Sequence, residues 1–238
     1  MSAAPGQVSA HELTLPLLPA FGGLVPGAVV QRGSVVGCEG PAAVSLSLAL
    51  AAGPSQQGAW VAVAGLPGLG LAAAAEAGVV LGRLVQVAAP QGSGPAGQQQ
   101  GQKWGDQQWG DVLAAMIDGF DVVLLGPGTQ GVKPGTARRL VARLRARGAV
   151  AITVAAPVFG ADLCFRAANP RWTGLGQGHG VAQGRRVVVE LTGRRVPRAR
   201  RAEMWLPAAD GRMCPLPEVV APVPVEHVAG PVPLDQAG

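Results

Sequence analysis

Short apolar runs alternate with helix-period segments through the first two thirds of the chain. The apolar runs predict strands at Val29–Val36, Ala59–Ala64, Leu84–Ala88, Asp121–Leu125 and Ala149–Ala155. The segments between them predict helices at Ala42–Ala52, Leu69–Gly78, Val112–Asp118 and Thr136–Arg147. Continuously apolar strands separated by helices are typical of a parallel sheet covered on both faces. We therefore expect an α/β fold with a mostly parallel central sheet flanked by helices.

The pattern changes after Pro157. Two runs, Arg185–Thr192 and Arg200–Leu206, predict a C-terminal antiparallel hairpin joined across Gly193–Pro197. Residues 207–238 are rich in proline, which predicts a disordered tail. We expect a lead-in over residues 1–20 and one domain over residues 21–206.

One segment of that domain differs in composition from the rest. Residues 91–108 are rich in Gly and Gln, which predicts a surface loop. A tandem echo, Trp104-Gly105-Asp106 and Trp109-Gly110-Asp111, begins in this loop. Its tryptophans can anchor a partner, but packing at a helix start is favoured for Trp109.

Composition argues against several classes of protein. The 238-residue chain is 48% hydrophobic, yet its longest apolar region, Ala59–Pro90, is interrupted by glycines, a proline and charges. A membrane-spanning helix needs about 20 consecutive apolar residues, so we expect no membrane span. The first dozen residues have no basic and apolar pattern of a secretory signal. The three cysteines, Cys38, Cys164 and Cys214, are widely spaced, which favours a reducing cytoplasm and predicts neither a disulfide framework nor a metal site.

A glycine-rich stretch, Gly37-Cys38-Glu39-Gly40-Pro41-Ala42-Ala43-Val44-Ser45, stands between a predicted strand and a predicted helix. That order is typical of a phosphate-binding P-loop, which needs G-x-x-x-x-G-K-[ST]. Counting from Gly37, the second Gly falls on Ala42, the Lys on Ala43 and the Ser/Thr on Val44. The outline of a nucleotide loop is present without its charge. When the loop is taken alone, a plain strand-to-helix turn of another Rossmann-like fold is the favoured interpretation, since glycine turns are common.

Further segments resemble a known family. Phe21-Gly22-Gly23-Leu24-Val25-Pro26-Gly27, Gly78–Leu84 and Asp121–Leu125 resemble the core of the bacterial recombinase RecA. More closely, Gly148-Ala149-Val150, Arg171–Gly176 and the arginine-rich hairpin ending Trp205-Leu206-Pro207 resemble the ImuA-type RecA relatives of actinobacteria. The resemblance covers roughly residues 15 to 207 and implies a RecA-like core.

The resemblance also implies where catalytic groups would stand. The P-loop Lys falls on Ala43, the catalytic Glu on Leu66, and the Walker B Asp on Gly126. Because phosphoryl transfer depends on positioning and charge neutralisation, we expect a pseudo-ATPase that is not an enzyme and holds no cofactor. An alternative is a nucleotide-binding recombination regulator that holds ATP weakly through Gly37, Gly40 and Ser45.

By resemblance, the partner is an ImuB-like protein, the inactive Y-family polymerase relative, and through it a DnaE-type polymerase and the sliding clamp. The function implied is that of a non-catalytic adaptor in mutagenic translesion synthesis, part of the SOS response to DNA damage.

The remaining signal is charge. Fourteen arginines lie between Arg138 and Arg201, opposed within that stretch by Asp162 and Glu190. An arginine-rich half predicts an anionic partner, either DNA phosphates or an acidic protein face. For Arg138–Arg147 alone a solvated helix face is favoured. Around the predicted turn we expect contact with a partner or DNA through five arginines: Arg194, Arg195, Arg198, Arg200 and Arg201.

Overall fold

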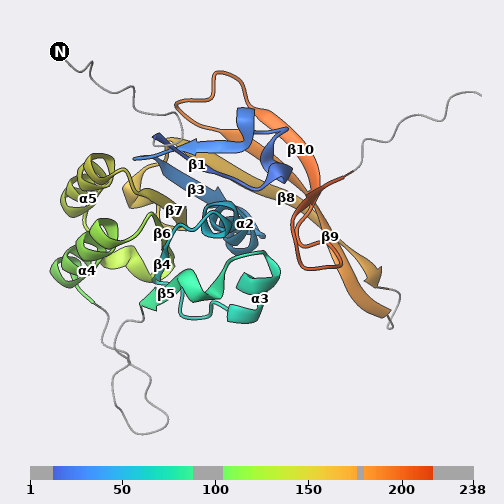
Figure 1. Cartoon of the computed structure of the whole chain (residues 1–238), viewed down its shortest axis with the longest axis horizontal. Helices are drawn as coiled ribbons and strands as arrows, with labels where there is room; N and C mark the ends of the chain where they lie inside the picture. The colour runs from blue at the N-terminus through green and yellow to red at the C-terminus, as the bar shows by residue number, and fades with distance from the viewer. Residues whose placement is uncertain (1–12, 88–103, 176–179, 217–238) are drawn as a thin grey trace, which may run out of the picture.

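A computed structural model describes residues 13–87, 104–175 and 180–216 as a mixed α/β fold built on a large sheet (Figure 1). Its strands are β1 Thr14–Pro16, β2 Val29–Gln31, β3 Val35–Glu39, β4 Val61–Ala64, β5 Leu84–Val87, β6 Val122–Leu125, β7 Val150–Val154, β8 Leu163–Leu175, β9 Gly180–Thr192, β10 Arg200–Trp205 and β11 Cys214–Pro215. Its α-helices are α2 Ala43–Gln56, α3 Leu71–Glu76, α4 Asp106–Gly119 and α5 Pro134–Arg147. Within the described residues, nine strands form one sheet in the order β11-β10-β9-β8-β3-β7-β6-β4-β5.

The six strands from β8 to β5 in that order run parallel. Their carboxyl ends therefore share one edge, the carboxyl edge, and their amino ends share the opposite one, the amino edge. β9 is antiparallel to β8, and β10 is antiparallel to β9. The turn between β9 and β10 consequently lies at the amino edge. This topology confirms the mostly parallel sheet and the C-terminal antiparallel hairpin.

Helices cover both faces of the sheet, because successive residues of each buried strand point to opposite sides. In β6, Val122 and Leu124 belong to the core beneath α2 and α3, while Val123 and Leu125 belong to the core beneath α4 and α5. Figure 1 shows α4 and α5 on one side of the strands and α2 and α3 on the other. Burial on both faces accounts for the unbroken apolar runs of the sequence.

The predicted strand Val29–Val36 was wrong in its continuity. The backbone turns at Arg32-Gly33-Ser34 and splits the apolar run in two. Gly33 in this turn has a φ of +78°. A Cβ on Gly33 would lie 3.1 Å from the Cα of Arg145. β2 pairs with β1 in a separate two-stranded sheet, and β3 enters the main sheet between β7 and β8.

β8, with 13 residues, is the longest strand that the sequence did not predict. Its register to β9 shifts between Ala168 and Arg171, where Asn169 has a positive φ of 50°. This irregularity, with Pro170 beside it, hides the period of two on which strand prediction depends.

Several element ends differ from those expected. α4 begins at Asp106, within the predicted loop 91–108, whose residues 91–103 lie outside the described residues. The lead-in over residues 1–20 contributes β1 with its buried Leu15, and the proline-rich segment contributes β11 and the buried Met213. The rest of that segment, residues 217–238, lies outside the described residues. No helix within the described ranges is long and apolar enough to cross a membrane.

Candidate functional site

The glycine-rich loop lies at the carboxyl edge, between the end of β3 and the start of α2. A cavity of about 370 Å³ opens there. It is lined by Cys38, Glu39, Gly40, Pro41, Ala42, Ala43, Val44, Val154 and Ala155. The predicted strand, glycine turn and helix are therefore adjacent in space, and the amino end of α2 faces the cavity.

The shape of the loop depends on Gly40. Its φ is +88°, a conformation that favours glycine. A Cβ at this position would also lie 2.1 Å from the carbonyl oxygen of Ala167 in β8. Ala42, the residue that caps the start of α2, provides no side-chain hydrogen bond. The first N–H groups of α2 thus lack a side-chain acceptor, as in a loop that would receive an external anion.

The electrostatics of this cavity oppose an anion. Glu39 is the one charged residue among the nine that line it, and its side chain is 53% exposed. Its Oε2 lies 3.4 Å from the Nε of Arg166, so that arginine is engaged by the carboxylate. Ala43 and Val44 place methyl and isopropyl groups where a P-loop has a cation and a hydroxyl. The cavity therefore combines a glycine turn and a helix start with a lining whose charged residue is an acid paired with Arg166.

Ser45 does not supply the missing hydroxyl. It lies outside the cavity lining, and its Oγ accepts a hydrogen bond of 2.8 Å from Nη2 of Arg185. Arg185 also donates from Nε to the carbonyl of Leu206 and lies over the ring of Trp172, 5.3 Å from its centroid. Burial lowers the pKa of this guanidinium. Arg185 therefore ties α2 to the hairpin and leaves Ser45 occupied.

Leu66 and Gly126 lie side by side at the same edge, after the adjacent strands β4 and β6. A Cβ on Gly126 would lie 2.3 Å from Cγ of Leu66 and 2.4 Å from the carbonyl oxygen of Gly65. Thr129 reinforces this packing by donating from Oγ1 to the carbonyl of Gly126 at 2.8 Å. The leucine fills the space that any side chain at position 126 would require. The two positions are in direct contact, which their separation in the sequence does not reveal.

The five hairpin arginines lie at the amino edge, on the far side of the sheet from the glycine loop. Arg195 donates to Oε1 of Gln31, and Arg200 donates to the carbonyl of Leu24 at 3.1 Å. Arg194, Arg198 and Arg201 are exposed and make no hydrogen bond or ion pair with the described residues. The structure thus brings these arginines to one turn, as the sequence predicted, and leaves three of their guanidinium groups unpaired.

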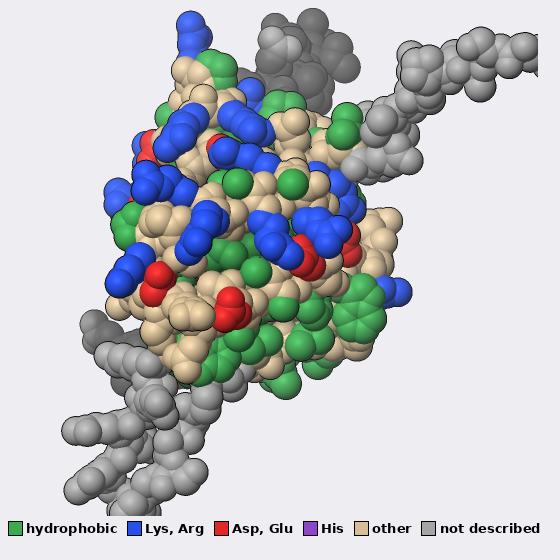
Figure 2. Space-filling model, turned by 90° about the vertical axis from the view of Figure 1, so that its left-hand side faces the viewer, with side chains coloured by type: hydrophobic (Ala, Val, Ile, Leu, Met, Phe, Trp, Pro, Cys, Tyr) green, Lys and Arg blue, Asp and Glu red, His purple; other side chains and the backbone are tan. Residues whose placement is uncertain are grey.

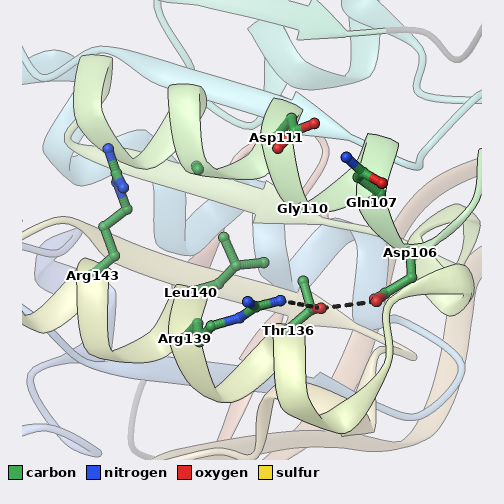
Figure 3. A pocket seen from close by; sticks show the side chains of 9 residues that line it. Asp106, Gln107, Gly110, Asp111, Thr136, Arg139, Leu140 and Arg143 are labelled. Atoms are coloured by element: carbon green, nitrogen blue, oxygen red, sulfur yellow. Dashed lines mark hydrogen bonds between the residues drawn. The ribbon is translucent and has the colours of Figure 1, made fainter.

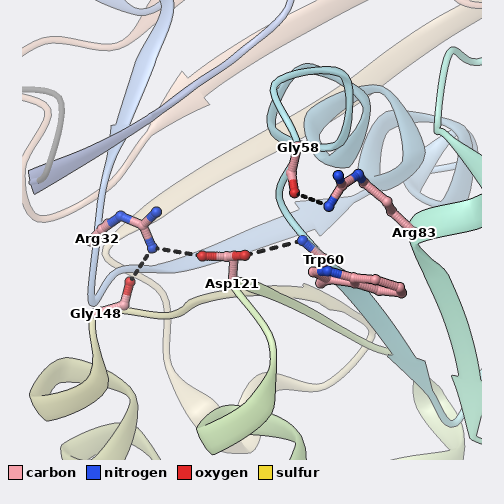
Figure 4. A network of polar contacts seen from close by, with 6 residues as sticks. All are labelled: Arg32, Gly58, Trp60, Arg83, Asp121 and Gly148. Carbon is pink, nitrogen blue, oxygen red and sulfur yellow. Dashed lines mark hydrogen bonds and ion pairs between the residues drawn. The ribbon is translucent and has the colours of Figure 1, made fainter.

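Other arginines reach the same edge. Arg145, at the end of α5, lies 3.7 Å from Oδ1 of the buried Asp162. Arg32 donates from Nη1 to Asp121 at 3.1 Å and to the carbonyl of Gly148 (Figure 4). Figure 2, viewed from the side of α4 and α5, shows many Lys and Arg side chains with few acidic ones among them. In the sequence, α5 and the hairpin are separate arginine-rich segments. The direction of the strands places the end of α5 and the turn of the hairpin at the same edge. This direction was the signal that could have connected the two segments.

Comparison with known proteins identifies the family. Residues 23–159, more than half of the chain, match the model of the MT3502 N-terminal domain. The chain belongs to this family. A relative, the uncharacterized protein Rv3395c of Mycobacterium tuberculosis (strain ATCC 25618 / H37Rv), is 36% identical over 104 residues. That match spans 44% of this chain and 44% of the relative, so less than half of the relative's length is represented.

The family match covers the glycine loop, Leu66 and Gly126 and ends before β8. The packing at the carboxyl edge thus belongs to the family's domain. The hairpin arginines lie beyond the matched residues, so the family match carries no information about them.

A larger groove, which sequence reasoning missed, lies between α4 and α5 (Figure 3). It has a volume of about 500 Å³. Asp106 accepts hydrogen bonds from Lys133 N at 2.7 Å and from Thr136 Oγ1 at 2.9 Å, which hold its carboxyl pKa below the usual range. Arg139 donates to the same threonine hydroxyl at 3.1 Å. Asp106 therefore fastens the start of α4 to the start of α5.

The two Trp-Gly-Asp repeats, residues 104–106 and 109–111, contribute to this groove. Trp109 is buried in α4 and meets Trp104 edge to face, with ring centroids 4.7 Å apart. The aspartates of the two repeats, Asp106 and Asp111, both line the groove. The expectation that Trp109 packs at a helix start is confirmed. The echo has a structural explanation.

The thiols and carboxylates offer no metal centre within the described residues, where no group of three His, Cys, Asp or Glu side chains converges. Burial raises the pKa of the Cys164 thiol to about 11, and burial also raises the pKa of Cys38. Both groups are therefore protonated near neutral pH and weakly nucleophilic.

Proposed function

We propose that this protein is a non-catalytic, RecA-like adaptor that acts in DNA-damage-induced mutagenic translesion synthesis. Its partner in this proposal is an ImuB-type inactive polymerase relative, which brings the DnaE-type polymerase and the sliding clamp. The observation that carries the proposal is the carboxyl edge, where a loop with the outline of a nucleotide cradle holds Glu39 and no cation in its lining. A binding role fits a fold that keeps its shape without the charge needed for phosphate chemistry.

The proposed RecA-like fold is supported by the order of the elements along the chain and by the positions of Leu66 and Gly126. The strand–glycine loop–helix unit of β3 and α2 is followed by strands whose carboxyl ends carry Leu66 and Gly126 at the same edge. In the resembling family this edge holds the nucleotide and its catalytic carboxylates. The antiparallel hairpin of β9 and β10 extends the same sheet, which agrees with the C-terminal part of the resemblance.

The non-catalytic reading rests on space as well as on charge. A carboxylate restored at Gly126 would collide with Leu66, and a phosphate placed at Ala43 would meet the Glu39 carboxylate. Phosphoryl transfer requires charge neutralisation and positioning, so these two features support a non-catalytic role.

We assign the partner to the unpaired side of the last strand of the sheet, β5. β5 is the last strand of the sheet in the described part of the chain, and its outer backbone pairs with no described strand. Leu81 and Val85 on and beside it are 43% and 37% exposed. An extended segment can add to such an edge through main-chain hydrogen bonds and seat side chains on the exposed apolar groups.

Co-purification tests the adaptor role. The full chain and a full-length ImuB-type protein are expected to elute together in gel filtration at micromolar concentration. The double variant Leu81→Asp, Val85→Asp is expected to weaken the association about tenfold or more. The matched control is Leu175→Asp, Val181→Asp, which places the same charges on exposed apolar positions of β8 and β9. An unmodified pair that elutes separately contradicts the proposal.

A titration with a fluorescent ATP analogue and Mg²⁺ tests the nucleotide-binding alternative. We expect no saturable binding, because the cradle lacks a cation and Ser45 is held by Arg185. Saturable Mg²⁺-dependent binding would instead support a nucleotide-binding recombination regulator.

A further inference from the structure

The amino edge carries an excess of positive charge drawn from separate elements. The β2–β3 turn, the end of α5 and the β9–β10 turn meet there, since each flanks the amino end of a parallel core strand or the matching end of the hairpin. The arginines of this arginine edge are Arg32, Arg143, Arg145, Arg147, Arg194, Arg195, Arg198, Arg200 and Arg201. The carboxylates among the same described segments are Asp118, Asp121, Asp162 and Glu190.

Three of these four carboxylates are already engaged, whereas Glu190, which lies opposite Arg201 in the register of β9 and β10, makes no ion pair with the described residues. Asp118 pairs with Arg143 and Arg147, Asp121 pairs with Arg32, and Asp162 lies beside Arg145. The unpaired guanidinium groups of Arg194, Arg198 and Arg201 stand out from this layer. A layer of ion pairs explains the arginines of α5 structurally. It does not explain three further arginines at one turn.

An exposed aromatic side chain extends the arginine edge. Trp60, at the amino end of β4, is 43% exposed, and its backbone N–H donates to Oδ2 of Asp121 at 3.1 Å. The other oxygen of that carboxylate accepts from Arg32, so Trp60 and the arginine edge share one network (Figure 4). Arg83, whose guanidinium lies 5.6 Å from the centroid of Trp60, adds a further cation. One face of the ring therefore lies against Arg83, and the residue is joined to Arg32 through Asp121.

We infer that the arginine edge, with Trp60 and Arg83, binds single-stranded DNA. Guanidinium groups are suited to sequence-independent phosphate contacts, and an exposed tryptophan offers a face on which an unpaired base can stack. The exposed Trp60 favours a single strand, whose unpaired bases can stack on its ring, over an acidic protein face. The choice of DNA over RNA rests on the proposed function. The assignment of a single-stranded polyanion to the arginine edge does not depend on the proposed function.

Fluorescence anisotropy with a labelled dT oligonucleotide tests the inference on the full chain. The variant Arg194→Gln, Arg198→Gln, Arg201→Gln removes three cations that make no described contact, so the fold is preserved. We expect its slope of log affinity against log salt to fall by about 2, since each lost phosphate contact removes about 0.7 for a single strand. Affinity at low salt is expected to fall about tenfold or more.

A charge-matched control separates this edge from general electrostatics. Arg138, Arg171 and Arg212 are exposed, make no described side-chain contact and lie away from the amino edge. Their triple change to Gln alters the net charge equally and is expected to leave affinity within about twofold. Equal losses in the two triple variants would overturn the assignment to the arginine edge.

Trp60 separates single strands from other polyanions. Trp60→Ala is expected to weaken dT binding about tenfold and to leave binding of a duplex of the same length unchanged, while Trp60→Phe retains most of the affinity. Unchanged dT binding by Trp60→Ala contradicts stacking. A polyglutamate peptide that displaces dT as well as unlabelled dT does would indicate an acidic-protein surface, and tighter binding of oligo(U) would overturn the choice of DNA. Because these readouts need no partner protein, they fail independently of the co-purification.

Discussion

The two edges of one sheet have opposite characters. At the carboxyl edge, glycines let backbone and apolar side chains close against one another, and Glu39 contributes a negative charge to the remaining cavity. At the amino edge, arginines from three segments surround a layer of buried and half-buried carboxylates. In an open α/β sheet, ligands usually bind outside the carboxyl ends of the strands. Here the cavity at the carboxyl edge is lined by Glu39 and apolar groups, whereas the unpaired cations lie at the amino edge.

In the proposed RecA-like relationship, the loss of a nucleotide site must be compensated in the packing. Deleting a catalytic carboxylate from a cavity leaves space that costs packing energy. Leu66 fills the space next to Gly126, so no room is left there for a side chain at position 126. The packing at this part of the carboxyl edge therefore depends on the absence of a side chain at position 126.

The largest expected effect tests this packing. Gly126→Ala would place a Cβ 2.3 Å from Cγ of Leu66 and 2.4 Å from the carbonyl of Gly65, which is expected to lower the free energy of unfolding by about 3 kcal/mol. Urea denaturation measures the change. Gly135→Ala in α5 is the control, because no heavy atom lies within 4 Å of its Cβ position, and it is expected to leave stability within about 0.5 kcal/mol.

A double-mutant cycle sharpens the same prediction. Leu66→Ala is expected to cost stability in the unmodified chain, because Leu66 is buried, and less in the Gly126→Ala background, where it relieves the contact. The rescue is expected to be partial, since the carbonyl of Gly65 still opposes the added methyl group. Strict additivity of the two changes would contradict a direct contact between the positions.

A smaller effect tests the support beneath the arginine edge. Asp162 is buried, and its Oδ2 accepts the backbone N–H of Val35 at 3.0 Å while Oδ1 lies near Arg145. Asp162→Ala leaves that buried N–H without its acceptor, so the free energy of unfolding is expected to fall by about 2 kcal/mol. Asp162→Asn keeps an acceptor oxygen and is expected to lose about half as much.

The control for this change is Asp111→Ala, an exposed aspartate on α4 that makes no described hydrogen bond or ion pair. Urea denaturation of the three variants should rank Asp162→Ala as the least stable. In addition, Asp162→Asn raises the net charge of the arginine edge by one, so oligonucleotide affinity is expected to stay the same or rise. A fall in affinity without a loss of stability would contradict the electrostatic account.

How much the sequence predicted differs between the two edges. The strands of the parallel core were predictable because each is buried on both faces, as in Val122–Leu125. The glycine loop was predictable because its residues are consecutive. The contact between Leu66 and Gly126 was not, since the two positions are sixty residues apart and meet only when β4 and β6 are neighbours.

The arginine edge was predictable in part for a similar reason. The five hairpin arginines are close in sequence, so their clustering at a turn could be anticipated. Their proximity to Arg145 and Arg32 depends on strand direction and on β8, which the irregularity near Asn169 concealed. Trp60 gave no local signal, because its exposure depends on where β4 begins relative to Asp121.

The smallest expected effect concerns pH at the rim of the arginine edge. Hydrogen bonds from Arg143 and Arg147 hold the pKa of Asp118 well below its usual range. A carboxyl whose pKa is lower in the folded chain than in the unfolded chain, where it is about 3.9, stabilises the fold above that pH and loses this contribution as the pH falls. Asp118→Asn is therefore expected to lower the Tm slightly at pH 7 and to match the unmodified chain in acid. The effect is small because this carboxylate is exposed and stands near the C-terminus of α4, where the helix dipole opposes it. Asp111→Asn, an exposed aspartate without such partners, is the matched control. If the difference persists undiminished when salt is raised to about 1 M, screening is not acting on it and the ion pairs are not its source.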